Sequence, residues 1–233
     1  MRTTRPVHRR STTVGYACGT DTKLRIIHAS IGLFAVNGFE RTSTREIARR
    51  AGVNAPALQY YFDGKEGLYV SCAEYIIEQA GAIFAPLLAS IRARLAHPLP
   101  RDELIECVCG IMDRAVDFIS VNPEMETWAR FMEDCDREGS APSVGEIIER
   151  GLRRELTAVL SELIGRITGR GAADADTRIR VVTLGSQVSL FHIARQRTLQ
   201  AIGWTEIREE QIASIRAIIR HQTHAALQAA QLH

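Results

Sequence analysis

Apolar side chains recur along almost the whole chain at intervals of three and four residues, which is the spacing of one helix face. The first stripe, Leu24, Ile27, Ile31 and Phe34, predicts a helix over residues 22–37 that ends at Gly38. Further helices are expected at residues 44–51, 55–61, 65–96, about 104–121, 125–132, about 144–167, 174 or 176 to about 201, and 206 to about 230. Because no alternating strand pattern occurs, the sequence predicts an all-α fold.

The two shortest helices are predicted to be joined by a tight turn. Ser43 precedes Glu46 by three residues, the spacing of a capping box at a helix start. Gly52 allows the sharp turn that follows. Asn54 can cap the second helix, and Pro56 lies in its first turn, where a missing amide costs little. This arrangement is that of a helix-turn-helix, whose second helix can enter a DNA major groove.

Positive charge is concentrated at the same end of the chain. Residues 1–70 hold 11 Lys and Arg against 5 Asp and Glu, a net charge of +6. The other 163 residues hold 18 against 22, a net charge of −4. This distribution suits attraction to phosphate at one end, although ordinary surface variation is an alternative. Residues 1–20 are expected to form a flexible basic arm, either a solvated tail or an arm that reaches DNA.

A set of short motifs between Lys23 and Tyr69 resembles the DNA-binding domain of TetR-family transcriptional regulators. The motifs are Asn-Gly-Phe at 37–39, Thr-Ser-Thr-Arg-Glu-Ile-Ala at 42–48, Ala-Gly-Val-Asn at 51–54, Tyr-Tyr-Phe at 60–62 and Gly-Lys-Glu-Gly-Leu-Tyr at 64–69. The run from Asn54 to Tyr69 most resembles the branch with a CerR-type (CecR-like) C-terminal domain. The resemblance implies a three-helix DNA-binding domain over residues 21–69 and a helical ligand-binding and dimerisation domain over residues 70–233.

Ten residues are expected to contact DNA: Thr42, Ser43, Thr44, Asn54, Ala55, Pro56, Ala57, Gln59, Tyr60 and Lys65. On the reading helix, Gln59 can bond an adenine edge, while Ala55 and Ala57 can pack on thymine methyl groups. The resemblance implies phosphate contacts from Tyr60, from Lys65 and from residues 42–44. Gln59 departs from the family pattern, which more often has an aromatic residue there, so its contact is either a base or the backbone.

The resemblance also implies a ligand pocket among the middle helices and a dimer interface formed by the last two. The candidate pocket residues are mostly aromatic or sulfur-containing side chains: Phe84, Met112, Phe118, Met125, Trp128, Phe131, Met132 and His192. Plain core packing is the alternative for each of them. A seam between two copies is expected from Gly185 and Ser186 together with Ile212, Ile215, Ile218 and Ile219.

Other chemistries find little support in the sequence. The five cysteines form no C-x-x-C pair, so neither a disulfide framework nor a zinc site is expected, and a reducing cytoplasm is the default. His221 and His224 lie at helical spacing without further ligands, so no metal is expected. With no run of 18 apolar residues, no membrane span is expected. No catalytic or cofactor-binding motif occurs, so neither an enzyme nor a cofactor is expected.

Together these features predict a homodimeric transcriptional repressor that binds a palindromic operator and is released by a small-molecule effector. Two alternatives stay open within the same class: an activator, or a regulator that acts without a ligand. A remote alternative is an all-helical enzyme that uses the N-terminal module only as a tether.

Overall fold

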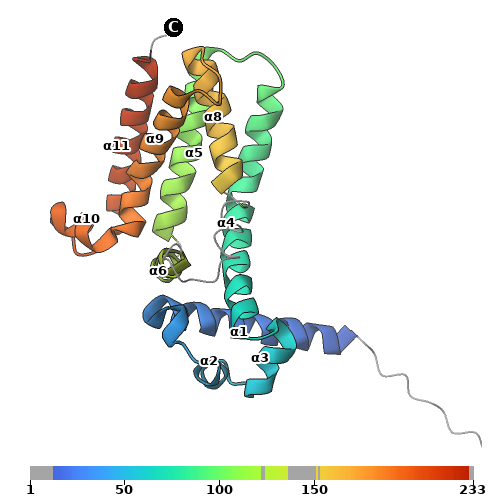
Figure 1. Ribbon diagram of the computed structural model, residues 1–233. Coiled ribbons are helices and arrows are strands. Elements are labelled where there is room, and N and C mark those ends of the chain that lie inside the picture. The colour runs from blue at the N-terminus through green and yellow to red at the C-terminus, as the bar shows by residue number, and fades with distance from the viewer. Residues whose placement is uncertain (1–12, 122–123, 136–150, 152, 231–233) are drawn as a thin grey trace, which may run out of the picture.

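The computed structural model describes residues 13–121, 124–135, 151 and 153–230, and within these ranges every regular element is a helix (Figure 1). The elements are α1 Thr13–Arg41, α2 Thr44–Ala51, α3 Ala55–Phe62, α4 Lys65–Leu95, α5 Arg101–Val121, α6 Met125–Cys135, α8 Arg154–Thr168, α9 Ala175–Ile193, α10 Arg195–Ala201 and α11 Glu209–Gln228. The predicted all-α fold class is therefore confirmed. Residues 1–12, which make up most of the predicted arm, lie outside the described residues.

The N-terminal end of the molecule is a small bundle of α1, α2 and α3 closed by the first turns of α4. Phe34, Ile47 and Leu58 supply its core, one from each of the first three helices. Two predictions about α1 were wrong. The helix already begins at Thr13, and Leu24 is 39% exposed, whereas Ile26, two positions further on, is fully buried.

Helix α4 connects this bundle to the rest of the molecule (Figure 1). Its 31 residues would span about 46 Å at 1.5 Å per residue. An 18-residue window has a mean hydropathy of 1.3, so by length and composition alone α4 could cross a membrane. Here its buried residues, from Leu68 at the lower end to Leu88 and Ile91 at the upper end, pack against α1, α3, α5 and α8. Pro86 is accommodated within the helix.

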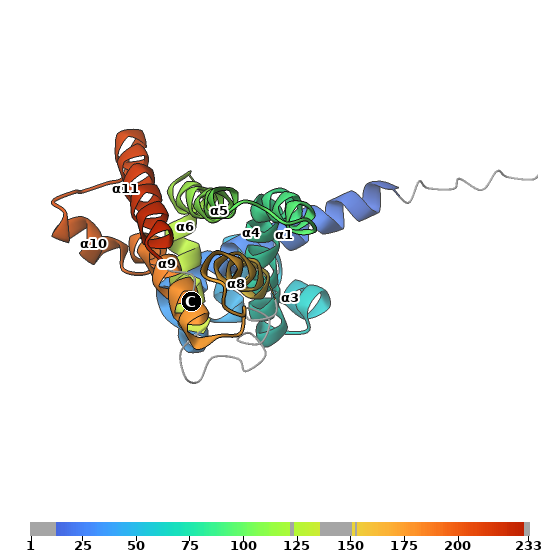
Figure 2. The ribbon, with the colours of Figure 1, turned by 90° about the horizontal axis from the view of Figure 1, so that it is seen from above.

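The C-terminal half packs α5, α8, α9 and α11 side by side around an apolar core (Figure 2). Ile105, Leu163 and Ile219 represent three of these helices in that core. One long helix was predicted up to about residue 201. It is interrupted at Ala194, whose φ of −109° and ψ of 30° separate α9 from the short α10. The first part of the predicted helix over 144–167 lies outside the described residues.

Arginines from α5 and α11 hold this half together. On α11, Arg216 pairs with Asp117, and Arg220 pairs with Asp113 and Glu106 of α5. At the other end of α5, the Arg101 guanidinium donates to the carbonyl oxygens of Ile167 at 2.9 Å and Leu227 at 2.8 Å, and to that of Ala230. These carbonyls lie at the C-terminal ends of α8 and α11, where helices leave acceptors unpaired.

Replacing Arg101 by Ala should therefore lower the free energy of unfolding by about 1–3 kcal/mol, the usual cost of leaving part-buried hydrogen-bond acceptors without a charged donor. The matched control is Arg114→Ala in the same helix, because Arg114 is exposed and its loss should change stability by less than about 0.5 kcal/mol. Urea unfolding followed by circular dichroism measures both. Equal stability of the two variants would show that Arg101 does not join the helix ends.

Candidate functional sites

The helix-turn-helix forms through local hydrogen bonds that the sequence already indicates. The Ser43 hydroxyl accepts from the amide of Glu46 at 3.2 Å and starts α2. Gly52 ends α2 with a φ of +67°, a left-handed conformation that favours glycine. The Asn54 side chain then accepts from the amide of Ala57 at 3.2 Å and starts α3. The angle between α2 and α3 is thus set by three residues within twelve positions of each other.

Helix α3 presents one face to solvent and one to the core. Leu58 and Phe62 are buried, whereas Tyr60 is 83% exposed and Gln59 is also exposed. The Gln59 amide donates to the Asp63 carboxylate at 3.0 Å, which holds the side chain along the surface of α3. An exposed face on a short, capped helix is the geometry needed to enter a major groove.

Most of the predicted DNA-contact residues lie on the surface of this unit. Ser43, Asn54, Ala55, Pro56, Gln59 and Tyr60 are exposed, and Thr44, Ala57 and Lys65 are half-buried. The sequence analysis overlooked three exposed arginines of α2, Arg45, Arg49 and Arg50. Their signal was available, because Ile47, Ala48 and Ala51 mark the buried face of α2 and place the arginines on the other side.

Thr42 does not fit the predicted role of a phosphate contact. Its side chain is 1% exposed, and its hydroxyl donates to the carbonyl oxygen of Gly38 at 2.8 Å. Thr42 therefore ties the end of α1 to the start of the helix-turn-helix. The Lys65 ammonium is partly engaged too: it donates to the Glu40 carbonyl at 3.3 Å and lies 4.3 Å from the centre of the Phe39 ring.

The start of α4 touches the end of α3 so closely that only glycine fits. A Cβ atom on Gly67 would lie 1.9 Å from the carbonyl oxygen of Phe62. Gly64, between the two helices, has a φ of +103°. Any movement of α4 at this point must therefore be transmitted to α3.

Helix α6 is fastened to the entrance of the helix-turn-helix by Asp134. One carboxylate oxygen accepts from the amide of Phe39 at 2.9 Å and from the hydroxyl of Tyr69 at 2.9 Å. Burial raises the pKa of Tyr69 well above its ordinary value, and Cys135 and Asp134 raise it further, so the hydroxyl stays protonated as a donor. We call this set, Asp134 with Phe39 and Tyr69, the α6 joint.

The other end of α6 is also close to α1. His28 Nδ1 lies 3.3 Å from a carboxylate oxygen of Glu124, next to the first residue of α6, and its Nε2 lies 3.1 Å from the Tyr75 hydroxyl of α4. Helix α6 packs more extensively on α1 than on any other helix. It is therefore part of the link between the two halves.

An apolar cavity of about 680 Å³ lies between α5, α8 and α9, with contributions from α4 and α6. This volume is within the range of small-molecule sites, roughly 300–1,000 Å³. Four of the predicted pocket residues, Phe84, Met112, Phe118 and Met125, line it. The sequence analysis overlooked the polar lining of Arg153, Thr157, Arg178 and Ser189, and it assigned Gly185 and Ser186 to a seam between two copies, whereas both line the cavity. Arg178, Val182, Gly185 and Ser189 follow one helical stripe, which was the available signal.

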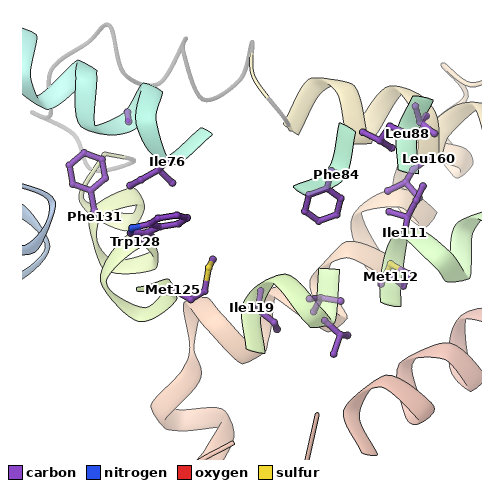
Figure 3. Close-up of a cluster of buried hydrophobic side chains, with 14 of the residues drawn as sticks. Ile76, Phe84, Leu88, Ile111, Met112, Ile119, Met125, Trp128, Phe131 and Leu160 are labelled. Atoms are coloured by element: carbon purple, nitrogen blue, oxygen red, sulfur yellow. The ribbon is translucent and has the colours of Figure 1, made fainter. Parts of the chain in front are cut away.

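Three of the remaining pocket candidates pack outside the cavity lining. Phe131 packs with its ring centre 4.9 Å from that of Tyr69, and Trp128 packs edge-on to Tyr75 at 6.3 Å. Met132 is half-buried against the core, and the side chain of His192 lies outside the described residues. In Figure 3, Met125 stands between Ile119 on the cavity side and Trp128, beyond which lies Phe131. Aromatic character did not distinguish pocket residues from those that join the two halves.

Cys72, Cys107, Cys109 and Cys135 are buried free thiols. Burial raises the pKa of Cys72 and Cys107, and raises that of Cys109 to about 11, so these thiols are protonated at neutral pH. In the part of the chain that the structure describes, no group of three or more His, Cys, Asp and Glu side chains is placed to hold a metal ion.

Comparison with known proteins agrees with this geometry. Residues 26–72 match the model for bacterial regulatory proteins of the tetR family, and residues 104–230, more than half of the chain, match the model for the C-terminal domain of the HTH-type transcriptional dual regulator CecR. The chain belongs to the TetR family of transcriptional regulators, in the CecR branch. The HTH-type transcriptional dual regulator CecR of Shigella flexneri is 28% identical over 194 residues, 82% of this chain and 85% of that protein. The predicted family and its CecR-like branch are confirmed.

Solved TetR-like structures share the fold. AibR, crystallised with isovaleryl coenzyme A and operator DNA, superposes with a TM-score of 0.60 at 14% identity, covering 86% of this chain and 97% of AibR. FadR from Bacillus subtilis, crystallised with stearoyl-CoA, has a TM-score of 0.57 at 14% identity, with 87% and 97% covered. At these identities the likeness shows the fold alone. The helix-turn-helix followed by a helical C-terminal domain is thus the arrangement of a TetR-family regulator.

Replacing Gly67 by Ala should separate α3 from α4, because the added Cβ would clash with the Phe62 carbonyl. We expect affinity for DNA to fall at least tenfold and the melting temperature to decrease. Gly81→Ala is the matched control: it lies in the same helix, and its Cβ would meet no atom within 4 Å, so this variant should bind normally and be no less stable. Normal DNA binding by Gly67→Ala would mean that the α3–α4 contact adjusts freely.

Proposed function

We propose that this TetR-family regulator is a homodimeric repressor that binds a palindromic operator and is released by a small-molecule effector bound in the apolar cavity. The proposal rests on one observation: α6 lines the cavity with Met125 and holds the entrance of the helix-turn-helix with Asp134. Under this proposal residues 21–69 bind DNA, and residues 70–233 bind ligand and dimerise. The protein acts on DNA in the cytoplasm, without a cofactor and without catalysing a reaction.

Operator reading is assigned to the exposed face of α3. Ala55, Ala57 and Tyr60 lie on or beside this face, and Gln59 reaches a base edge once its amide leaves Asp63. Ser43 and Thr44 supply the start of α2, where unpaired amides favour phosphate. The three exposed α2 arginines add positive charge beside it.

We assign the dimer interface, the surface that contacts a second copy of the chain, to an exposed apolar stripe on α9. Ile179 and Leu190 are 60% and 54% exposed, and they lie three helical turns apart on one side of the helix. Ile218 of α11 is 57% exposed. By contrast, Ile215 and Ile219, which were expected in this seam, are buried within the chain. To read a palindrome, a dimer through the stripe must place its two α3 helices about 34–36 Å apart, or a multiple of that distance.

Effector release requires that the ligand prefer the conformation that does not bind DNA. A hundredfold loss of operator affinity needs about 2.7 kcal/mol of such preference. A ligand between α5, α8 and α9 would touch Met125 and Phe84, the residues through which α6 and α4 reach the cavity. Helix α6 meets the α6 joint with its last turn and α4 with its first turns, so a shift of either helix changes the support of α1 and α3. Two proteins of this fold were solved with acyl-CoA molecules, which supports a ligand-binding role for the C-terminal half.

An activating role is a second candidate, because the S. flexneri relative is named a dual regulator. Repressors and activators bind at different positions relative to the promoter. Footprinting together with in vitro transcription separates them: transcription that falls on adding the protein supports repression, and transcription that rises supports activation.

The proposed function is tested by selecting genomic DNA fragments with the purified protein at two salt concentrations. A palindromic consensus with an affinity that falls steeply with salt is expected, because phosphate contacts release counterions. Gel filtration and a stoichiometry of two chains per site should accompany it. The absence of any enriched sequence from the ligand-free protein would overturn the proposal.

Replacing Gln59 by Ala should weaken operator binding by about 1–3 kcal/mol and relax selection at one base position, if the side chain reads an adenine. Gln200→Ala is the matched control, since Gln200 is exposed on α10, far from the helix-turn-helix. Fluorescence anisotropy with the selected operator and its single-base variants measures both effects. An affinity loss that is equal for every base variant would assign Gln59 to the backbone.

Replacing Asp134 by Ala should lower operator affinity at least tenfold, because the amide of Phe39 and the hydroxyl of Tyr69 lose their common acceptor. Glu133→Ala, a loss of the same charge at an exposed neighbouring position, serves as the control and should leave affinity nearly unchanged. Circular dichroism verifies that each variant is folded. Unchanged operator affinity in a folded Asp134→Ala protein would show that the α6 joint contributes to packing but not to DNA binding.

A further inference from the structure

The cavity is elongated along α9. Four of its lining residues, Arg178, Val182, Gly185 and Ser189, succeed one another at intervals of four, three and four positions, so they form one stripe of that helix. The eleven positions from Arg178 to Ser189 correspond to about 16 Å along the axis. Helix α5 supplies a parallel stripe from Ile111 to Ile119. A ligand that fills this space must therefore extend along α9.

The two ends of the cavity differ. At the end where α9 begins stands Arg178. The other end lies toward α6: residues of α6 and the segment that follows α9 line one common hollow, which places the C-terminal end of α9 beside α6. Met125, the first residue of α6, lines the cavity there. The sides between these ends are mainly apolar.

The charged side chains that line the cavity are all basic. Two of the described lining residues are arginines and none is acidic: Arg178 stands near the start of α9, and Arg153 stands at the start of α8, toward the opposite end of the cavity. Arg178 is exposed and makes no ion pair with any described residue, whereas Arg180, two positions along α9, pairs with Asp176 at 2.9 Å. A guanidinium is always charged at physiological pH and presents a planar fork that matches a carboxylate. Arg178 therefore gives one end of an apolar channel a site for an anion.

We propose that the effector is an amphipathic carboxylate, an unbranched aliphatic chain that lies along α9 with its carboxylate on Arg178 and its chain end at Met125. This proposal rests on the proposed function and names the chemical class of its effector. Because Met125 begins the helix that holds the α6 joint, chain length determines whether the ligand reaches α6. Methionine is flexible enough to adjust to chains of different length, so a graded rather than an all-or-none preference is expected.

The test is calorimetric titration of the full-length protein, without DNA, with octanoate, dodecanoate and hexadecanoate below their micelle concentrations. Dodecanol, dodecyltrimethylammonium and dodecanoyl-CoA are titrated in parallel. We expect dodecanoate to bind at least tenfold more tightly than dodecanol, and the cationic amphiphile not to bind. Dodecanol binding as tightly as dodecanoate, or no binding by any of the three carboxylates, would overturn the proposal.

The variants Arg178→Gln and Arg180→Gln test whether the ligand carboxylate binds to Arg178. Arg178→Gln should weaken dodecanoate binding at least tenfold and leave dodecanol binding unchanged. Arg180→Gln, the same change two positions away, should bind dodecanoate as the unaltered protein does. Equal effects of the two variants would overturn the assignment to Arg178. So would dodecanoyl-CoA binding that is tighter than dodecanoate binding and insensitive to Arg178→Gln.

Operator release is measured separately, with dodecanoate added to the protein on its selected DNA. Dodecanoate that binds the free protein at Arg178 without releasing DNA would support the ligand class and contradict effector release. Release by a neutral compound, without binding of any carboxylate, would contradict the ligand class and leave the proposed function standing.

Discussion

The amide of Phe39 is the point on which the two halves of this protein depend. It follows Gly38, whose φ of +77° interrupts α1, so it has lost its helical partner and would be a costly unpaired donor in a half-buried position. Asp134, 95 residues later, accepts from it and also binds the Tyr69 hydroxyl. One carboxylate therefore joins the end of α1, the first turns of α4 and the last turn of α6. Without it, the entrance of the helix-turn-helix would lack a fixed support.

Aromatic packing makes this joint stiff. The ring of Tyr69 lies 4.8 Å from that of Phe39 and 4.9 Å from those of Phe34 and Phe131, centre to centre. Because close-packed rings leave little free volume, one ring cannot shift without displacing its neighbours. A small displacement of α6 thus has few ways to be absorbed before it reaches α1. This mechanical property makes a distant cavity able to influence the DNA-binding end.

The division of charge complements that arrangement. The first 70 residues carry a net charge of +6 and the remaining 163 a net charge of −4, so attraction to phosphate acts on one end of the molecule. The cavity, in contrast, is apolar and lies within the other half, with arginine as its only charged lining in the described part. Binding of DNA and binding of a ligand therefore rely on different forces at separate places. The α6 joint and the α3–α4 contact are the physical connections between them.

By itself, the sequence determined the helix-turn-helix almost to the residue. Ser43, Gly52 and Asn54 act on backbone groups within three or four positions, and such local hydrogen bonds can be read from spacing. It also determined the all-α class and the family. Only the tertiary structure decided which side chains share a site. Phe118 and Phe131 look alike in the sequence, yet one lines the cavity and the other packs on Tyr69. Their surroundings come from helices far away in the chain, and no local pattern records a distant partner.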